Sequence, residues 1–175
     1  MNVEPTPGQR LAVLFLKNYF MKKSLLFVLL CVMLNACKDD PCSNPLPAGD
    51  TFVFSKYYCE CIGSCITGYK LAGQGLFQGA GTWCDPATLT FSDTPLSDDK
   101  ASLAQTLRYE IPAQMLDSDE DIYGCPDCGD WGGYYIELTS GGTTKSWRLD
   151  TKKDDLPVDI KAYVEMLEQT LADLQ

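Results

Sequence analysis

The 175-residue sequence contains no histidine. Histidine is the commonest general base near neutral pH and the commonest metal ligand in proteins. Its absence excludes a Ser-His-Asp or Cys-His catalytic site within this chain, and every zinc site that requires imidazole. Any catalysis must therefore use carboxylates, thiols or backbone groups. The sequence shows no arrangement of these groups that we assign to a reaction, so we expect neither a catalytic site, a metal site nor a cofactor.

Basic residues are scarce beyond the N-terminus. The formal net charge is −10, with 14 Lys and Arg against 24 Asp and Glu. Residues 1–36 hold four of the basic residues and one acidic residue, which leaves a net charge of −13 for residues 37–175. Such an acidic surface repels phosphate backbones, so we expect no nucleic-acid partner and favour neutral ligands, cations or basic proteins. The alternative is that this net negative charge only keeps the protein soluble and indicates no particular partner.

An apolar segment long enough to span a bilayer is missing as well. The run Leu25–Leu34 has ten residues, whereas a spanning helix needs about 20. A short run directly after Lys22 and Lys23 is typical of a signal peptide. We therefore expect residues 21–36 to be a signal peptide and residues 1–20 to be an upstream extension from a misassigned start.

The sequence Leu34-Asn35-Ala36-Cys37, which follows the apolar run, resembles the lipobox of bacterial lipoproteins. The resemblance implies cleavage before Cys37 and a diacylglyceryl group on its thiol. A further acyl chain can then be added to the freed amine. Each buried methylene contributes about 0.8 kcal/mol, and more than one chain makes such anchoring stable. The covalent lipid on Cys37 is the one non-protein group that we expect.

Lys38, Asp39 and Asp40 come directly after this cysteine. They are similar to the lysine-plus-two-acids export signal that sends Bacteroidetes-type lipoproteins to the outer face of the outer membrane. The resemblance implies a lipid-anchored protein facing the cell exterior. Residues 37–50 are rich in Pro, Asp and Asn, which is typical of a tether between the lipid and a folded domain.

Residues 51–175 are expected to form a single α+β domain. Short β-branched and aromatic segments, separated by Gly or Pro, predict an antiparallel four-strand meander. Its strands are expected at 51–58, 64–72, 75–83 and 87–93. A hairpin should follow at 134–139 and 143–149, because Ser140-Gly141-Gly142 between them is a turn signal.

Two helices are expected in the same domain. The first should begin after Ser97, a good N-cap, and end or kink at Pro112. The second is indicated by apolar residues at helical spacing near the C-terminus. They are Ile160, Val164, Leu167, Leu171 and Leu174. We expect this C-terminal helix to pack on one face of the antiparallel sheet.

Seven cysteines remain beyond Cys31 and Cys37, and in an exported protein such a set first indicates disulfides. The candidates are Cys59, Cys61, Cys65, Cys84, Cys125 and Cys128, with Cys42 on the tether left over. A meander returns Cys84 to the edge that holds Cys59, Cys61 and Cys65. Cys59 and Cys61 should point to the same face and need separate partners. We expect Cys125 and Cys128 to pair with different members of this cluster, or one with the cluster while the other closes locally.

Cys125 and Cys128 have the spacing of a thiol-disulfide oxidoreductase site. Such sites normally start a helix whose N-terminus activates the thiol, whereas a Gly-rich segment and a strand follow here. A four-cysteine zinc site is a further alternative, but oxidising surroundings and the spacing weigh against it.

Asp127, Asp130 and Trp131 lie in an acidic loop that could hold a ligand or a cation. The loop departs from the calcium-binding EF-hand pattern, because Ile122 stands where the turn glycine belongs and Cys128 where the bidentate glutamate belongs. Trp131 could present its ring to a sugar or a peptide, or could turn inward. Two functions remain open: a surface-exposed, lipid-anchored binding or interaction module of unknown ligand, and an exported oxidoreductase.

Overall fold

The computed structural model describes residues 46–73 and 75–175. The expected signal peptide, Cys37 and the Lys38-Asp39-Asp40 signal lie outside the described residues, as does Cys42. None of the helices within the described ranges is both long enough and apolar enough to cross a membrane.

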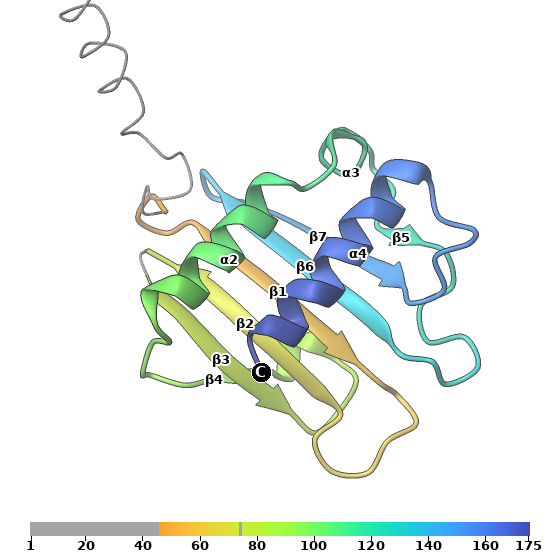
Figure 1. Ribbon diagram of the computed structural model, residues 1–175, viewed down its shortest axis with the longest axis horizontal. Coiled ribbons are helices and arrows are strands. Elements are labelled where there is room, and N and C mark those ends of the chain that lie inside the picture. The colour runs from red at the N-terminus through yellow and green to blue at the C-terminus, as the bar shows by residue number, and fades with distance from the viewer. Residues whose placement is uncertain (1–45, 74) are drawn as a thin grey trace, which may run out of the picture. The chain divides into compact units, whose positions relative to one another are not determined.

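The described residues form one seven-stranded sheet with the strand order β4-β3-β2-β1-β6-β7-β5 (Figure 1). The strands are β1 (Thr51–Tyr57), β2 (Ile66–Ala72), β3 (Gly75–Gly81), β4 (Thr90–Phe91), β5 (Ile122–Tyr123), β6 (Gly133–Ser140) and β7 (Thr143–Asp150). Neighbouring strands are antiparallel except β5 and β7, which are parallel. The expected meander and hairpin are confirmed, and β1 joins them: Phe54 pairs with Tyr69 on one side and with Ile136 on the other.

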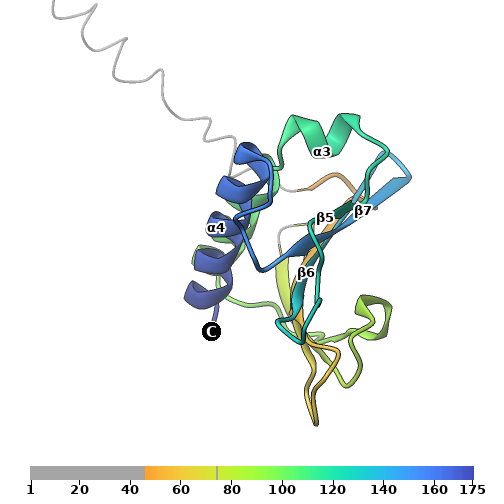
Figure 2. The ribbon, with the colours of Figure 1, turned by 90° about the vertical axis from the view of Figure 1, so that its right-hand side faces the viewer.

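Two longer helices cover one face of this sheet. They are α2 (Asp98–Tyr109) and α4 (Val158–Asp173), and they lie side by side, with the short α3 (Ala113–Asp117) at one end (Figures 1 and 2). The expected helices after Ser97 and at the C-terminus are thus confirmed, and the domain is α+β. Ser97 occupies the N-cap of α2 without a side-chain capping bond.

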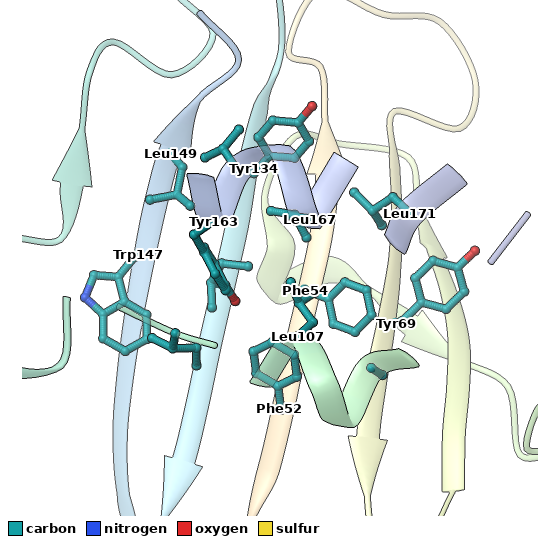
Figure 3. Close-up of a cluster of buried hydrophobic side chains, with 14 of the residues drawn as sticks. Phe52, Phe54, Tyr69, Leu107, Tyr134, Trp147, Leu149, Tyr163, Leu167 and Leu171 are labelled. Carbon is teal, nitrogen blue, oxygen red and sulfur yellow. The ribbon is translucent and has the colours of Figure 1, made fainter. Parts of the chain in front are cut away.

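The core lies between the helices and the sheet. Phe52 and Phe54 of β1 point into it and are fully buried (Figure 3). Leu107 of α2 and Leu167 of α4 pack against this aromatic layer from the helix side. Each such side chain contributes about 1.5–3 kcal/mol through burial. All five apolar positions that predicted the C-terminal helix are buried in the structure.

The chain before β1 is more ordered than a tether. Leu46 is buried in the core, and its N–H donates to the carbonyl of Gly73. The Asp50 carboxylate accepts hydrogen bonds from the Ser140 hydroxyl and from the Gly141 N–H. The packed domain therefore begins by Leu46 instead of Thr51, because the one leucine among the polar and proline residues finds a place in the core.

The expected strand at 87–93 is wrong in extent. Only Thr90 and Phe91 pair with β3, and a 3₁₀ turn, η2 (Pro86–Thr88), precedes them. The Asp85 carboxylate caps this turn by accepting the N–H of Ala87 at 3.0 Å. Proline fits the first position of such a turn because its ring presets the backbone angle. The segment 82–89 therefore leaves the sheet, and the chain rejoins it at Thr90.

This segment folds back over the sheet face that carries no helix, which we call the open face. In Figure 2 it stands out on the side of the sheet opposite α4. A Cβ atom added at Gly68 would lie 2.9 Å from Leu89 of this segment and 2.8 Å from the Cβ of Ser55. Gly68 therefore permits Leu89 to rest on the centre of the open face.

Candidate functional site

A cleft of about 300 Å³ lies on the open face, between the η2 turn and strands β5 to β7. The η2 side contributes Asp85, Pro86 and Ala87, the β5 side contributes Asp121 and Ile122, and β6 and β7 contribute Tyr135, Ser146, Trp147 and Arg148. This volume is at the lower end of the range for small-ligand sites.

Strand alternation places the two central side chains of the cleft. Tyr135 of β6 and Arg148 of β7 are cross-strand partners. Their neighbours Ile136 and Trp147 point the other way, into the core; Figure 3 shows the Trp147 ring there. Since successive side chains in a strand alternate between faces, Tyr135 and Arg148 project from the open face.

Asp121 is held next to Arg148 by the backbone. The N–H of Arg148 donates to the carbonyl of Asp121 at 2.8 Å, and the following residue, Ile122, pairs with Arg148 in the parallel ladder. Ile122 is half-exposed and adds an apolar surface to this side of the cleft.

The phenol of Tyr135 is kept neutral. Its hydroxyl donates to Oε2 of Glu137 at 2.6 Å. Burial and this hydrogen bond raise the pKa of Tyr135 to about 12, because both disfavour the phenolate. Near neutral pH the hydroxyl therefore serves as a hydrogen-bonding group and not as a base.

Arg148 is exposed, and within residues 46–73 and 75–175 its side chain makes no ion pair. Two acidic residues, Asp85 and Asp121, also line the same cleft. Neither forms an ion pair with Arg148 among the described residues. A ligand that offers both donors and acceptors can contact all three.

The wall of the cleft formed by η2 is fixed by a disulfide. Cys59, just after β1, is bonded to Cys84, the residue before Asp85, with their Cα atoms 4.7 Å apart. A second bridge joins Cys61 to Cys65 in the loop between β1 and β2. The meander geometry that brings Cys84 to this edge is confirmed, as are the separate partners of Cys59 and Cys61.

The expected pairing of Cys125 and Cys128 is wrong. They are bonded to each other, with a Cα–Cα distance of 5.4 Å, and neither joins the cluster. The backbone explains this outcome: the N–H of Cys128 donates to the carbonyl of Cys125, and Asp127 adopts a positive φ of 64°. This tight turn already brings the two thiols together, so no distant partner is needed.

Asp127 connects this turn to the edge of the sheet that holds Cys59, Cys61, Cys65 and Cys84, which we call the cysteine edge. Its Oδ1 accepts the N–H of Gly132 at 2.9 Å, and its Oδ2 accepts the N–H of Cys59 at 3.2 Å. The turn from Cys125 to Cys128 thus does reach the edge that holds the other cysteines, through a hydrogen bond instead of a disulfide.

Asp127, Asp130 and Trp131 have different surroundings in the structure. The Asp127 carboxylate is engaged by backbone, Asp130 is exposed, and the ring of Trp131, 59% exposed, lies beneath the ammonium group of Lys152 at 5.0 Å. The described part of the chain contains no group of three or more Cys, Asp or Glu side chains placed to hold a metal ion.

The cleft residues Asp85, Asp121, Tyr135 and Arg148 were not singled out from the sequence. Alternation along the predicted hairpin could have placed Tyr135 and Arg148 on the solvent face. The approach of Asp85 depends on the fold-back of segment 82–89. Asp85 and Pro86 indicate a turn in the sequence, but not the strands on which the turn packs. No protein-family model matches the chain, and no curated protein matches it at a significant level.

Proposed function

We propose that this protein is a binding module, held to the cell surface by a lipid on Cys37, and that the open-face cleft is its ligand site. One observation carries the proposal: Arg148 faces the cleft without an ion-pair partner among the described residues, beside Asp85 and Asp121. Convergent polar groups in a concave site that are not used up by the fold are typical of ligand binding.

Catalysis fits this cleft less well than binding. The chain has no histidine, and the Tyr135 phenol, whose pKa is raised to about 12, stays protonated near neutral pH. The remaining ionisable groups lining the cleft are two carboxylates and a guanidinium. An arginine does not exchange protons at physiological pH, so the cleft is better suited to hydrogen bonding.

The oxidoreductase alternative is disfavoured by the surroundings of Cys125. Its N–H donates to the Asp150 carboxylate at 2.8 Å, and Asp127 lies within the turn. Negative charges close to a sulfur oppose the thiolate that thiol-disulfide exchange requires. A strand, β6, follows the turn instead of a helix whose N-terminus would favour the thiolate.

Thiol counting separates the two functions. In protein purified without reductant, a binding module should contain no free thiol at Cys125 or Cys128, and mild reductant should leave their bridge intact. An accessible, reactive Cys125 thiol that cycles with an exported redox partner would establish the oxidoreductase instead.

The proposed ligand site can be tested by thermal stabilisation. A ligand that binds only the folded state raises its melting temperature. A panel of neutral sugars, amino acids and dipeptides should contain members that stabilise the purified protein, and Arg148→Ala should abolish the effect. Lys161→Ala removes the same charge from α4, on the opposite face, and should retain it. Stabilisation unaffected by Arg148→Ala, or absent across the panel, would contradict the proposed site.

The anchor has its own test, since it rests on the lipobox resemblance. Cys37→Ala should abolish acyl labelling and release or stall the precursor. Replacing Lys38, Asp39 and Asp40 with alanine should leave the protein on the membrane but protect it from protease added to intact cells. Wild-type protein without acyl label, together with unchanged membrane retention of Cys37→Ala, would contradict the anchor.

A further inference from the structure

The ligand class can be inferred from the charge of the cleft, provided that the cleft is the ligand site. Asp85 and Asp121 together outweigh Arg148, and Glu137 adjoins the cleft through its hydrogen bond to Tyr135. The chain as a whole carries a net charge of −10. An anionic ligand would meet a net negative surface, so the cleft favours a ligand without net negative charge.

The same cleft does not suit a simple cation. Arg148 pairs with Tyr135 of β6 on one side and with Ile122 of β5 on the other, so it lies in the middle of the cleft floor. A cation attracted by Asp85 and Asp121 would meet the guanidinium of Arg148 in the same cleft. Repulsion of like charges offsets the attraction, which leaves neutral molecules as the best match.

The Asp85 carboxylate and the Arg148 guanidinium require different hydrogen-bonding groups from a ligand. The Asp85 carboxylate uses Oδ1 to cap η2, and within the described ranges Oδ2 has no protein partner. Carboxylates only accept hydrogen bonds, whereas a guanidinium only donates them in a fixed fork. A pair of adjacent hydroxyl groups can donate to a carboxylate and at the same time accept from the fork of Arg148.

The apolar part of the cleft completes the match. Exposed Ala87 and half-exposed Ile122 contribute carbon surface beside these polar groups. A sugar ring presents hydroxyl groups around its rim and carbon-bound hydrogens on its faces. A volume of about 300 Å³ is also sufficient for one or two such rings.

We propose that the open-face cleft binds a neutral saccharide, with vicinal hydroxyl groups bridging Arg148 and the carboxylates of Asp85 and Asp121. One ring face packs against Ile122 and the other against Ala87, on opposite sides of the cleft. The Tyr135 hydroxyl donates to Glu137 and also has a hydrogen bond with Ser146, so it supports the floor of the cleft.

Titration calorimetry of the full protein tests this proposal. The probes are glucose, galactose, mannose and N-acetylglucosamine, each with its linear oligomers, alongside glycine, lysine and short peptides as charged competitors. At least one neutral saccharide should bind saturably, and its affinity should be nearly independent of salt, because neither partner exchanges net charge. Arg148→Ala and Asp121→Asn should each weaken binding at least tenfold.

Matched controls exclude general effects of charge. Lys161→Ala and Asp93→Asn make the same changes in charge at positions outside the cleft, and both should bind within twofold of the wild type. Binding of a zwitterion or peptide that requires Arg148, without any saccharide binding, would overturn the saccharide inference and leave the proposed ligand site standing. Saccharide binding that Arg148→Ala does not weaken would overturn the inference as well, since the sugar would then occupy another surface.

Discussion

Oδ2 of Asp127 accepts a hydrogen bond from the backbone N–H of Cys59 at 3.2 Å, across 68 positions of sequence. Cys59 is in turn bonded to Cys84, which precedes the cleft residue Asp85. The turn between Cys125 and Cys128, the end of β1 and the η2 wall of the cleft are thereby joined in one chain of contacts. Disulfides and a carboxylate hold the cysteine edge together.

Removing the Asp127 carboxylate should destabilise the fold. Asp127→Ala leaves the N–H groups of Cys59 and Gly132 without their partner, and hydrogen bonds to a charged group contribute about 1.5–3 kcal/mol each. We expect a loss of about 2–3 kcal/mol in the free energy of unfolding, measured by urea denaturation. Asp130→Ala, at the other non-glycine residue with positive φ, is the control for backbone effects; an equal loss there would contradict the role of the carboxylate.

The bridge between Cys59 and Cys84 should matter more than the bridge between Cys125 and Cys128. The first closes a loop of 25 positions and the second a loop of 3. In the chain-entropy description the longer loop contributes about 3.5 kcal/mol and the shorter about 2 kcal/mol. Replacing each pair by serine and measuring urea denaturation should reproduce this order.

The two variants in which one cysteine pair is replaced by serine should also differ in ligand affinity. Loss of the Cys59–Cys84 bridge frees the η2 wall and should weaken saccharide binding. Loss of the Cys125–Cys128 bridge should leave binding within about twofold. The reverse order would show that the wall is not held as described.

Gly68→Ala tests the position of segment 82–89 on the open face. The new Cβ would lie 2.9 Å from Leu89 and 2.8 Å from Ser55, and overpacking of this kind costs about 1–3 kcal/mol. In the double variant Gly68→Ala and Leu89→Ala, the free energy of unfolding should fall by less than the sum of the two single losses, because removing the leucine relieves part of the clash. Additive losses would indicate that Leu89 does not rest on Gly68.

Ionisation of the Tyr135 phenol should lower the free energy of unfolding at high pH. Its pKa in the fold is raised to about 12, above the usual value of about 10 for a free tyrosine. The fold therefore favours the protonated phenol, and this contribution is complete below pH 10 and lost as the pH rises toward 12. Wild type should lose stability faster than Tyr135→Phe in this window, whereas parallel curves would contradict the shift. Phenol ionisation followed by NMR provides the site-specific check.

Much of the fold follows from local patterns in the sequence. The β-branched and aromatic residues at 51–57 form β1, most of which is buried, and the helical spacing from Ile160 to Leu174 matches the buried side of the C-terminal helix. The position of Cys84 beside Cys59 also follows, because a meander returns every second strand to the same end.

The remainder depends on tertiary contacts. Thr90 and Phe91 were expected within a longer strand, but Pro86 and the capping carboxylate of Asp85 start a turn that removes the preceding residues from the sheet. The disulfide between Cys125 and Cys128 results from a turn with positive φ at Asp127. Aspartate adopts a positive φ more readily than most residues, but its presence in a sequence does not predict one. The cleft could not be predicted from the sequence either, because its η2 wall forms only when the turn after Cys84 packs back over the sheet.

The most direct test of the ligand site is to map a bound saccharide onto the protein by amide chemical shifts in NMR. Titration with the best-binding neutral saccharide should shift the amide signals of Asp121, Tyr135, Ser146 and Arg148, and should leave those of α2 and α4 unchanged. Shifts confined to the helix layer, or to the loop around Trp131, would contradict this ligand site, as would the absence of any shift at these four residues at saturating ligand.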